Sequence, residues 1–228
     1  MRTLLVALSH PDDEVGCAGT IAAHRGLGDR VVLLWLTRGE MTEVYGDLDA
    51  QEVARLRVEH GRQAAEILGA EPLFMEFPDT AVQATPAAAR MVAPVLARVQ
   101  PDAILTWGDA WARGMRHPDH QATGQIVRDA VTLARLRRVV APLPPHRDAA
   151  TVFAFRGAHS TLPERAVDVT PHLETVLALG RFYQERVGWP EEEWLLNRLR
   201  TAGEAHGREA VELFDAWETP GGLSDRLF

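Results

Sequence analysis

The stretch SHPDDEVGCAGT, residues 9–20, directly follows an uninterrupted apolar run at residues 4–8. Such a run indicates a strand that is buried on both faces, and residues 15–27 have the composition of a helix. A second apolar run at residues 31–36 completes a β-α-β unit. The start of the chain therefore predicts a parallel sheet that is covered by helices.

The same alternation continues beyond this unit. Further strands are expected at residues 73–77, 103–107, 151–155 and 166–169, and further helices at residues 51–68, 86–99 and 121–136. Gly69 fits the glycine that commonly ends a helix. The remainder, through Trp217, is strongly charged and has a helical composition. We predict an α/β fold with a single doubly wound, mostly parallel, Rossmann-like sheet and a helical C-terminal part.

No linker or repeat divides the chain, so one domain over residues 1–228 is expected. It would comprise a Rossmann-like half (1–140), extra strands and helices (141–218) and a loose tail (219–228). With 46% hydrophobic and 25% charged residues, the composition disfavours disorder and membrane spans. A net charge of -8 without a basic stripe disfavours nucleic-acid partners. The lone Cys17 and a short apolar N-terminus predict a cytoplasmic protein, and a homo-oligomer is left open.

Polar clusters follow four of the expected strands. In chain order they are HPDDE at residues 10–14, TRGE at 37–40, PDT at 78–80 and HPDH at 117–120. The carboxyl ends of parallel strands meet at one edge of a sheet, where ligands bind. We therefore expect these four loops to build one site, with Trp107 and Trp111 as packing residues or pocket wall.

Two of these clusters contain metal-ligand residue types. His10, Asp13 and His120 supply two imidazoles and one carboxylate and leave coordination positions open, which is typical of a catalytic rather than a structural site. Zinc is the first choice, and iron(II) or another divalent ion also suits these ligands. The alternative is helix capping, because aspartate is a preferred N-cap residue and Asp12 and Asp13 precede a helix.

The sequence resembles the PIG-L (LmbE-like) de-N-acetylases. The motifs that carry the resemblance are SHPDDEVGCAGTIA, LTRGE, RLRVEHGRQAAEILG followed by FPDT, and RHPDH; FYQERV and GREAVELF match more loosely. The resemblance implies a metal-dependent hydrolase that removes acetyl from a small N-acetylglucosamine-containing molecule. Acetate would be released through a metal-bound water.

The resemblance also implies a role for each matching residue. It makes His10, Asp13 and His120 the metal ligands and Asp12 the general base. Bound zinc lowers the pKa of its water to about 7, and a positioned base contributes roughly 10²- to 10⁴-fold in rate.

The second histidine motif and two further positions complete the implied site. By resemblance, His117 is oriented by Asp119 and stabilises the oxyanion or protonates the leaving amine, and Arg57 and Asp79 grip sugar hydroxyls. A carboxylate beside an imidazole favours its protonated form. The chain departs from the family at two places. His60, with Glu59 adjacent, stands where a glutamate is common, and Met115 stands where some members have an aromatic residue.

Two other classes of protein share parts of this pattern. Facial-triad iron(II) oxygenases use a His-x-Asp and a distant histidine, which His10, Asp12 and His120 could mimic, but that chemistry normally resides on an all-β jelly roll. A non-catalytic sugar-binding protein would be expected to lack the base or the histidine–aspartate pair. Both are present here, so the sequence favours the hydrolase and leaves the aglycone of its substrate open.

Overall fold

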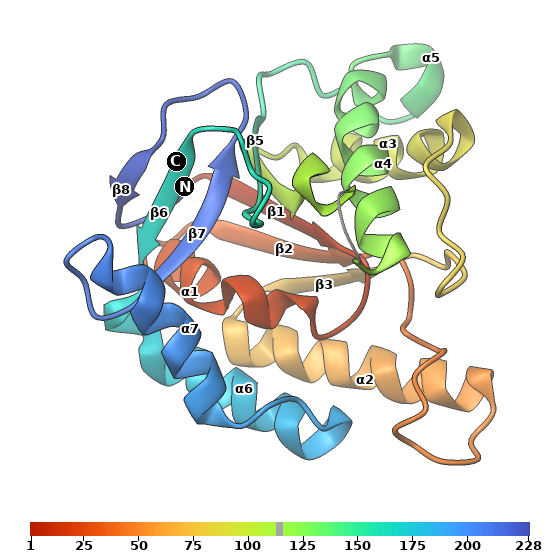
Figure 1. The fold of residues 1–228 in the computed structure, drawn as a ribbon. Helices are drawn as coiled ribbons and strands as arrows, with labels where there is room; N and C mark the ends of the chain where they lie inside the picture. Colours follow the sequence, from red (N-terminus) through yellow and green to blue (C-terminus); the bar gives the residue numbers. More distant parts are fainter. Residues whose placement is uncertain (113–115) are drawn as a thin grey trace.

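The computed structural model describes residues 1–112 and 116–228, and its strands and helices alternate through the first half as expected (Figure 1). The strands are β1 (Thr3–Leu8), β2 (Arg30–Trp35), β3 (Glu71–Phe74), β4 (Ala103–Trp107), β5 (Thr151–Phe155), β6 (Glu164–Asp168), β7 (Val211–Ala216) and β8 (Gly222–Ser224). The α-helices are α1 (Ala18–Gly26), α2 (Ala50–Leu68), α3 (Pro86–Val99), α4 (Pro118–Ala134), α5 (Arg137–Val140), α6 (Leu173–Val187) and α7 (Glu192–Glu204). Short 3₁₀ helices are η1 (Asp13–Cys17), η2 (Asp109–Ala112) and η3 (Thr170–His172).

The strands form one eight-stranded sheet in the order β3-β2-β1-β4-β5-β7-β6-β8. The pairs from β3 across to β5 are all parallel, and β7 runs antiparallel to both of its neighbours. The prediction of a single, mostly parallel α/β sheet is confirmed. The all-β jelly roll that an iron oxygenase normally requires is not this fold.

Helices cover both faces of the sheet (Figure 1). Alternate residues of β1 belong to different apolar clusters, with Leu4, Val6 and Leu8 on one face and Leu5 and Ala7 on the other. In Figure 1, helices α1, α2, α6 and α7 lie on one side of the sheet and α3, α4 and α5 on the other. Burial on both faces is the reason that the first two strands are uninterrupted apolar runs.

The order of the strands determines where a ligand-binding crevice is expected. β1 lies between β2 and β4. The chain runs outward from β1 through β2 to β3 on one side, and from β4 to β5 on the other, so the strand order reverses between β1 and β4. Open α/β sheets bind ligands at such a reversal. Helix α4 begins beside this point. It lies so close to β4 that a Cβ on Gly124 would stand 2.2 Å from the Trp107 carbonyl oxygen. Glycine there lets the first turn of α4, which carries the second histidine motif, reach the end of β1.

The C-terminal part differs from the expectation. Residues 211–216 were expected to be helical, but they form β7, which inserts between β5 and β6. The tail, expected to be loose, forms β8 beside β6, and Leu227 is fully buried. Pairing with strands about 50 residues away is a tertiary effect that overrides the helical propensity of Glu and Leu. The single domain over residues 1–228 stays a prediction.

Candidate active site

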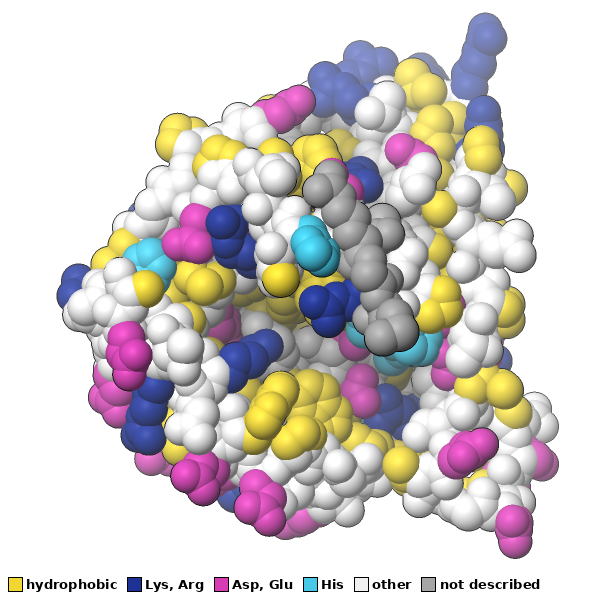
Figure 2. Space-filling model, in the orientation of Figure 1, with side chains coloured by type: hydrophobic (Ala, Val, Ile, Leu, Met, Phe, Trp, Pro, Cys, Tyr) yellow, Lys and Arg dark blue, Asp and Glu magenta, His cyan; other side chains and the backbone are white. Residues whose placement is uncertain are grey.

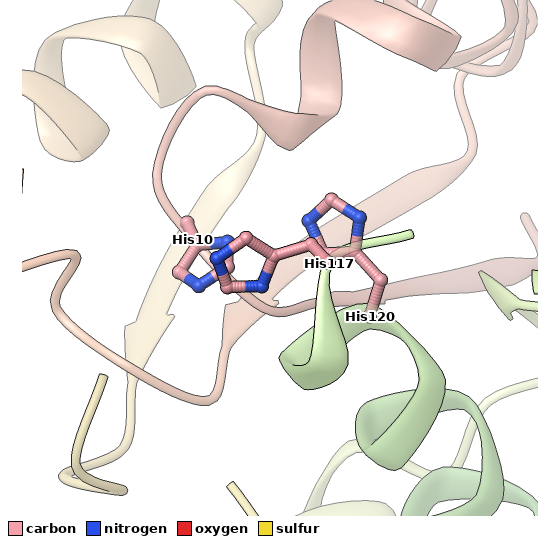
Figure 3. Close-up of side chains that lie close together, drawn as sticks. All are labelled: His10, His117 and His120. Carbon is pink, nitrogen blue, oxygen red and sulfur yellow. The ribbon is translucent and has the colours of Figure 1, made fainter. Parts of the chain in front are cut away.

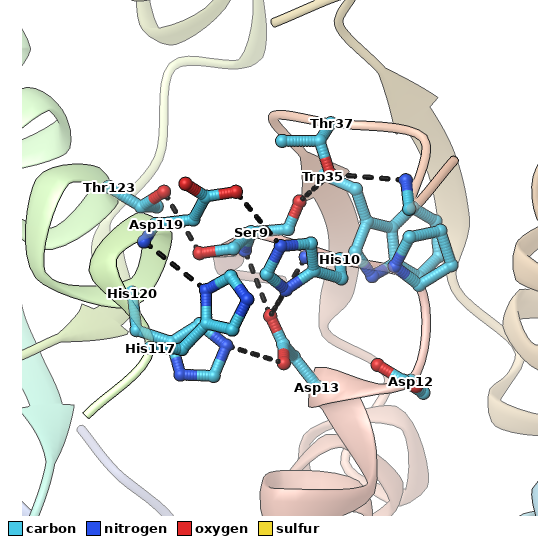
Figure 4. Close-up of polar contacts among 12 residues, drawn as sticks. Ser9, His10, Asp12, Asp13, Trp35, Thr37, His117, Asp119, His120 and Thr123 are labelled. Atoms are coloured by element: carbon cyan, nitrogen blue, oxygen red, sulfur yellow. Dashed lines mark hydrogen bonds and ion pairs between the residues drawn. The ribbon is translucent and has the colours of Figure 1, made fainter. Parts of the chain in front are cut away.

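The loop after β1 folds back on itself through one carboxylate. Asp13 Oδ2 accepts the backbone N–H groups of Ser9 (3.0 Å) and His10 (2.8 Å), while Asp13 Oδ1 pairs with His120 Nε2 at 3.1 Å (Figure 4). The helix-capping interpretation is not what the structure shows, because neither η1 nor α1 receives a side-chain cap at its first residue. Asp13 instead joins the loop after β1 to the second histidine motif.

His10 is surrounded by carboxylates. Its Nε2 lies 3.0 Å from Asp79 Oδ1 and 3.1 Å from Asp119 Oδ2, and its Nδ1 lies 3.7 Å from Asp13 Oδ2. Burial lowers the pKa of His10, but the hydrogen bonds with Asp119, Asp13 and Asp79 outweigh it and raise the pKa to about 12. Three converging carboxylates thus create a strongly negative position that favours a cation.

Two sets of side chains in the described part of the chain could hold a metal ion. In each set, one ligand atom per residue lies within 4.8 Å of the others: His10, His117 and His120 form one set, and His10, Asp79 and Asp119 the other. Figure 3 shows the three histidines side by side. The predicted ligands His10, Asp13 and His120 are brought together in pairs through Asp13.

His120 has one ring face occupied and one nitrogen free. The ring stacks on Trp107, with centroids 3.8 Å apart and an interplanar angle of 7°. Its Nδ1 is buried without a hydrogen-bond partner among the described residues. A buried polar atom without a partner costs free energy, so the site is incomplete as a purely structural cluster.

Asp12 contacts Arg57 and Trp189. Its Oδ2 lies 3.0 Å from Arg57 Nη2 and accepts the Trp189 indole N–H at 3.3 Å. Burial raises the pKa of Asp12, and the Arg57 charge opposes that shift. The backbone of Asp12 has φ 130°, a conformation that costs a non-glycine residue free energy and that clusters at functional sites. Two side chains and a strained backbone therefore fix this carboxylate.

The predicted pairing of Asp119 with His117 is not what the structure shows. The Asp119 carboxylate contacts His10 and accepts the backbone N–H groups of Thr80 (2.8 Å) and Val82 (3.2 Å). His117 Nδ1 instead accepts the backbone N–H of Asp119 at 3.3 Å. Burial, followed by the nearby charges of His10 and His120, lowers the pKa of His117. The expected carboxylate-supported imidazolium is therefore replaced by a neutral ring.

The two predicted substrate residues line a cavity of about 200 Å³ beside His10. Arg57 is only 3% exposed, yet its Nε and Nη1 have no partner among the described residues. Gly39 of the TRGE motif adopts φ +67°, and a Cβ there would come within 3.0 Å of Arg57 Nε. Asp79 is more engaged than expected, because its oxygens meet His10 and the backbone N–H of Met41 (2.9 Å).

Sequence reasoning missed the role of the third acid of HPDDE. Glu14 is fully buried and accepts hydrogen bonds from Trp35 Nε1 (3.0 Å), the Asp12 backbone N–H (3.0 Å) and the Tyr183 hydroxyl. Burial raises the pKa of Glu14 to about 7. Glu14 thus ties the loop after β1 to β2 and α6. The contact of Trp189 with Asp12 was missed as well. The only local signal for it in the sequence is that Trp189 is an aromatic residue in a charged segment.

The two departures from the family pattern have different outcomes. His60 Nδ1 lies 3.1 Å from the hydroxyl of Tyr45, and its ring meets Phe182 edge-on. His60 therefore contacts Tyr45 and Phe182, and it lies on α2 together with Arg57. Met115 lies outside the described residues.

The fold and the site together define a class: an α/β protein whose switch-point crevice gathers histidines and carboxylates suited to a divalent cation. The chain belongs to the PIG-L family, described as GlcNAc-PI de-N-acetylase, whose family model matches residues 5–131. The resemblance drawn from HPDDE and HPDH is confirmed.

One relative agrees with this membership, and two solved structures share the fold. A diacetylchitobiose deacetylase of Thermococcus kodakarensis is 30% identical over 217 residues, which cover 91% of this chain and 79% of that protein. N,N'-diacetylchitobiose deacetylase from Pyrococcus horikoshii shares the fold, with a TM-score of 0.83 at 24% identity over 95% of this chain and 84% of that one. GalB, the 4-carboxy-2-hydroxymuconate hydratase from Pseudomonas putida, also shares the fold, with a TM-score of 0.77 at 24% identity and full coverage of both chains.

Within residues 1–112 and 116–228, no helix combines the length and apolar character that crossing a bilayer requires.

Proposed function

We propose that this protein is a metal-dependent hydrolase that removes the acetyl group from a small N-acetylglucosaminide and releases acetate. The observation that carries the proposal is the convergence of HPDDE and HPDH on His10, next to a polar cavity. That cavity is lined by a buried arginine, two of whose nitrogens have no partner among the described residues. The family and the deacetylase that is 30% identical support the same reaction. The predicted cytoplasmic location stays a prediction.

The donor set fits a divalent cation. The carboxylates around His10 supply the negative charge, and His120 Nδ1 has no hydrogen-bond partner among the described residues, which supports a further ligand there. We assign the ligands to His10, Asp13 and His120 and favour Zn²⁺, which binds imidazole and carboxylate at catalytic sites. A divalent ion there would supply a water of lowered pKa and a Lewis acid for the amide carbonyl.

Asp12 is the general base in this proposal. Arg57 and Trp189 hold its Oδ2, which leaves Oδ1 to accept a proton from the attacking water. A carboxylate whose pKa is raised by burial is a stronger base than a solvated one, and the charge of Arg57 favours its ionised form. The same carboxyl can then carry that proton toward the leaving amine.

His117 acts as a hydrogen-bond donor. Because its Nδ1 accepts the Asp119 N–H, the neutral ring carries its proton on Nε2. His117 lines the same cavity as Asp12 and Arg57, and we propose that its N–H donates to the amide oxygen as negative charge develops there. In this arrangement Asp119 is a positioning residue, which orients His10 through its carboxylate and His117 through its backbone.

Sugar recognition falls to Arg57 and the residues around it. Nε and Nη1 of Arg57 are donors in need of acceptors, and pyranose hydroxyls supply them. Asp79, Thr42 and Thr80 line the same cavity and add further polar groups. We propose that the pyranose ring lies here, with its acetamide directed at His10.

The direct test is a metal-reconstituted acetate-release assay. Apoprotein prepared by chelation should be inactive on N-acetylglucosaminides, and Zn²⁺ should restore acetate release under anaerobic conditions. Because GalB is a hydratase, acetate itself must be measured, since water addition alone releases none. An absolute requirement for Fe²⁺ and dioxygen, or binding of the sugar without turnover under every metal, would refute the proposed function.

A further inference from the structure

A second and larger cavity is lined in part by two of the metal-ligand candidates. It encloses about 630 Å³, includes Asp13 and His120 in its wall, and extends between β7, α7 and the residues after β4. The space-filling view in Figure 2 shows a deep hollow in this face of the molecule. His10 therefore lines the small polar cavity, and Asp13 and His120 line the large one.

The wall of the larger cavity is mostly aromatic and aliphatic. Its apolar lining residues among the described residues are Trp107, Trp111, Phe155, Trp189, Trp194, Leu199, Ala202, Ala205, Val211 and Leu213. Helix α7 contributes several of them on one side, and Trp194 is 49% exposed at its surface. An exposed tryptophan beside a cavity offers a flat apolar surface that water solvates poorly.

Most polar groups in this wall are already engaged inside the protein. The indole N–H groups of Trp189 and Trp111 donate to Asp12 and to the Phe155 carbonyl, respectively. Glu212 is the clearest case, because its two oxygens accept the N–H groups of Gly19 (2.9 Å) and Thr20 (2.8 Å) at the start of α1.

Arg156 is similarly committed, to Asp215 and Glu164. Arg198 Nη2 donates to the Gly16 carbonyl oxygen at 3.4 Å. In the described part of the chain, Thr201, the buried Trp107 Nε1 and the buried His120 Nδ1 remain without such partners.

We propose that this cavity holds the aglycone of the substrate and that the aglycone is a flat, apolar group of the aryl type. The inference rests on the proposed function. With the C2 acetamide directed at His10, the glycosidic substituent leaves the adjacent ring carbon, and we place it in the cavity that Asp13 and His120 line.

A polar aglycone fits this cavity poorly. A second sugar, an inositol or a malate would carry several hydroxyl or carboxylate groups away from water. The few protein groups left free in this wall cannot satisfy them all, and each unsatisfied polar group costs free energy. An aryl group instead buries apolar area against the tryptophan faces.

The competing occupant is a large acyl group on the nitrogen. The proposed reaction releases acetate, whose methyl group needs far less room than about 630 Å³. We therefore assign the volume to the aglycone. A preference for long N-acyl chains over N-acetyl at a constant aglycone would overturn this assignment.

The kinetic test uses the zinc-loaded protein and five N-acetylglucosaminides: both anomers of the methyl glycoside, both anomers of the 2-naphthyl glycoside, and N,N'-diacetylchitobiose. We expect kcat/KM for the better 2-naphthyl anomer to exceed that of the matching methyl glycoside by about tenfold or more, because the naphthyl group buries apolar area. Equal values, or a preference for diacetylchitobiose, would overturn the proposal.

Two variants probe the cavity itself, and the readout is the ratio of kcat/KM for naphthyl over methyl. Trp194→Ala should lower the ratio severalfold, and Ala202→Trp, which fills the cavity from α7, should bring it close to one. Met91→Ala is the matched control, because Met91 is 56% exposed on α3 and lies outside the cavity. An unchanged ratio in folded Trp194→Ala protein would overturn the proposal.

A binding measurement separates this proposal from the proposed function. The deacetylated products, 2-naphthyl and methyl 2-amino-2-deoxyglucoside, need no turnover and can be compared by calorimetry on zinc-loaded protein. We expect the naphthyl product to bind about tenfold tighter or better. If no acetate is released from any glycoside, the proposed function fails, while equal binding of the two products refutes the aryl aglycone.

Discussion

Replacing Asp12 with asparagine tests the central assignment of the site. The amide keeps the shape of the side chain but cannot accept a proton from water. We expect kcat to fall by roughly 10²- to 10⁴-fold, the usual contribution of a positioned base. At about 1.4 kcal/mol per factor of ten, this corresponds to about 3–5 kcal/mol in the activation barrier.

The structure predicts a much smaller effect of Asp12→Asn on stability. Arg57, 3% exposed, loses its counter-charge, which is destabilising. The desolvation that raises the pKa of Asp12 disappears at the same time, and the amide oxygen can still accept from Arg57 and Trp189. We expect these opposing effects to leave a loss below about 2 kcal/mol, which lowers Tm by less than roughly 8 °C in a chain of this size.

The assay measures kcat, KM and Tm on one cleavable N-acetylglucosaminide, together with metal content by elemental analysis. Metal content and KM should stay close to those of the native protein. Asp47→Asn, on the exposed loop before α2, is the matched control and should change none of these quantities. Asp12→Asn protein that keeps kcat within tenfold of native would refute the base assignment. If this variant lost its metal and Asp13→Ala kept it, the two roles would be exchanged.

Three further outcomes are expected. Asp13→Ala should lose most of its bound zinc, because two ligands remain; a native zinc content by elemental analysis would remove Asp13 from the ligand set. Glu212→Ala should lower the free energy of unfolding in urea by about 1–3 kcal/mol, since two N–H groups at the start of α1 lose their acceptor, and an unchanged urea midpoint would contradict this. Burial lowers the pKa of His24 below 6.5 in the folded chain, so the contribution of His24 to stability is complete above about pH 6.5 and is lost as pH falls through the folded pKa. Protonation also breaks the hydrogen bond from the Leu227 N–H to His24 Nε2, so the hydrogen-exchange protection factor of Leu227 should drop between pH 7 and pH 5, and a constant factor would count against this reasoning.

The sequence alone determined the central sheet and the location of the site. Uninterrupted apolar runs identified β1 and β2, because strands buried on both faces need apolar residues at every position. Helices α2 and α3 were predictable from local signals, and Gly69 indeed adopts the left-handed conformation after α2. Since carboxyl ends of parallel strands share one edge, the order of HPDDE and HPDH along the chain also predicted that they would meet.

Tertiary structure decided which groups pair inside that site. Asp119 is next but one to His117, yet its carboxylate contacts His10, because α4 turns this side chain into the crevice between β1 and β4. Trp189, which holds Asp12, comes from 177 residues further along the chain. Sequence spacing reports which residues share a loop or a helix face. Hydrogen bonds between distant segments depend on how the helices pack against the sheet, and for that reason the structure was needed to assign the partners of Asp12, Asp119 and Glu14.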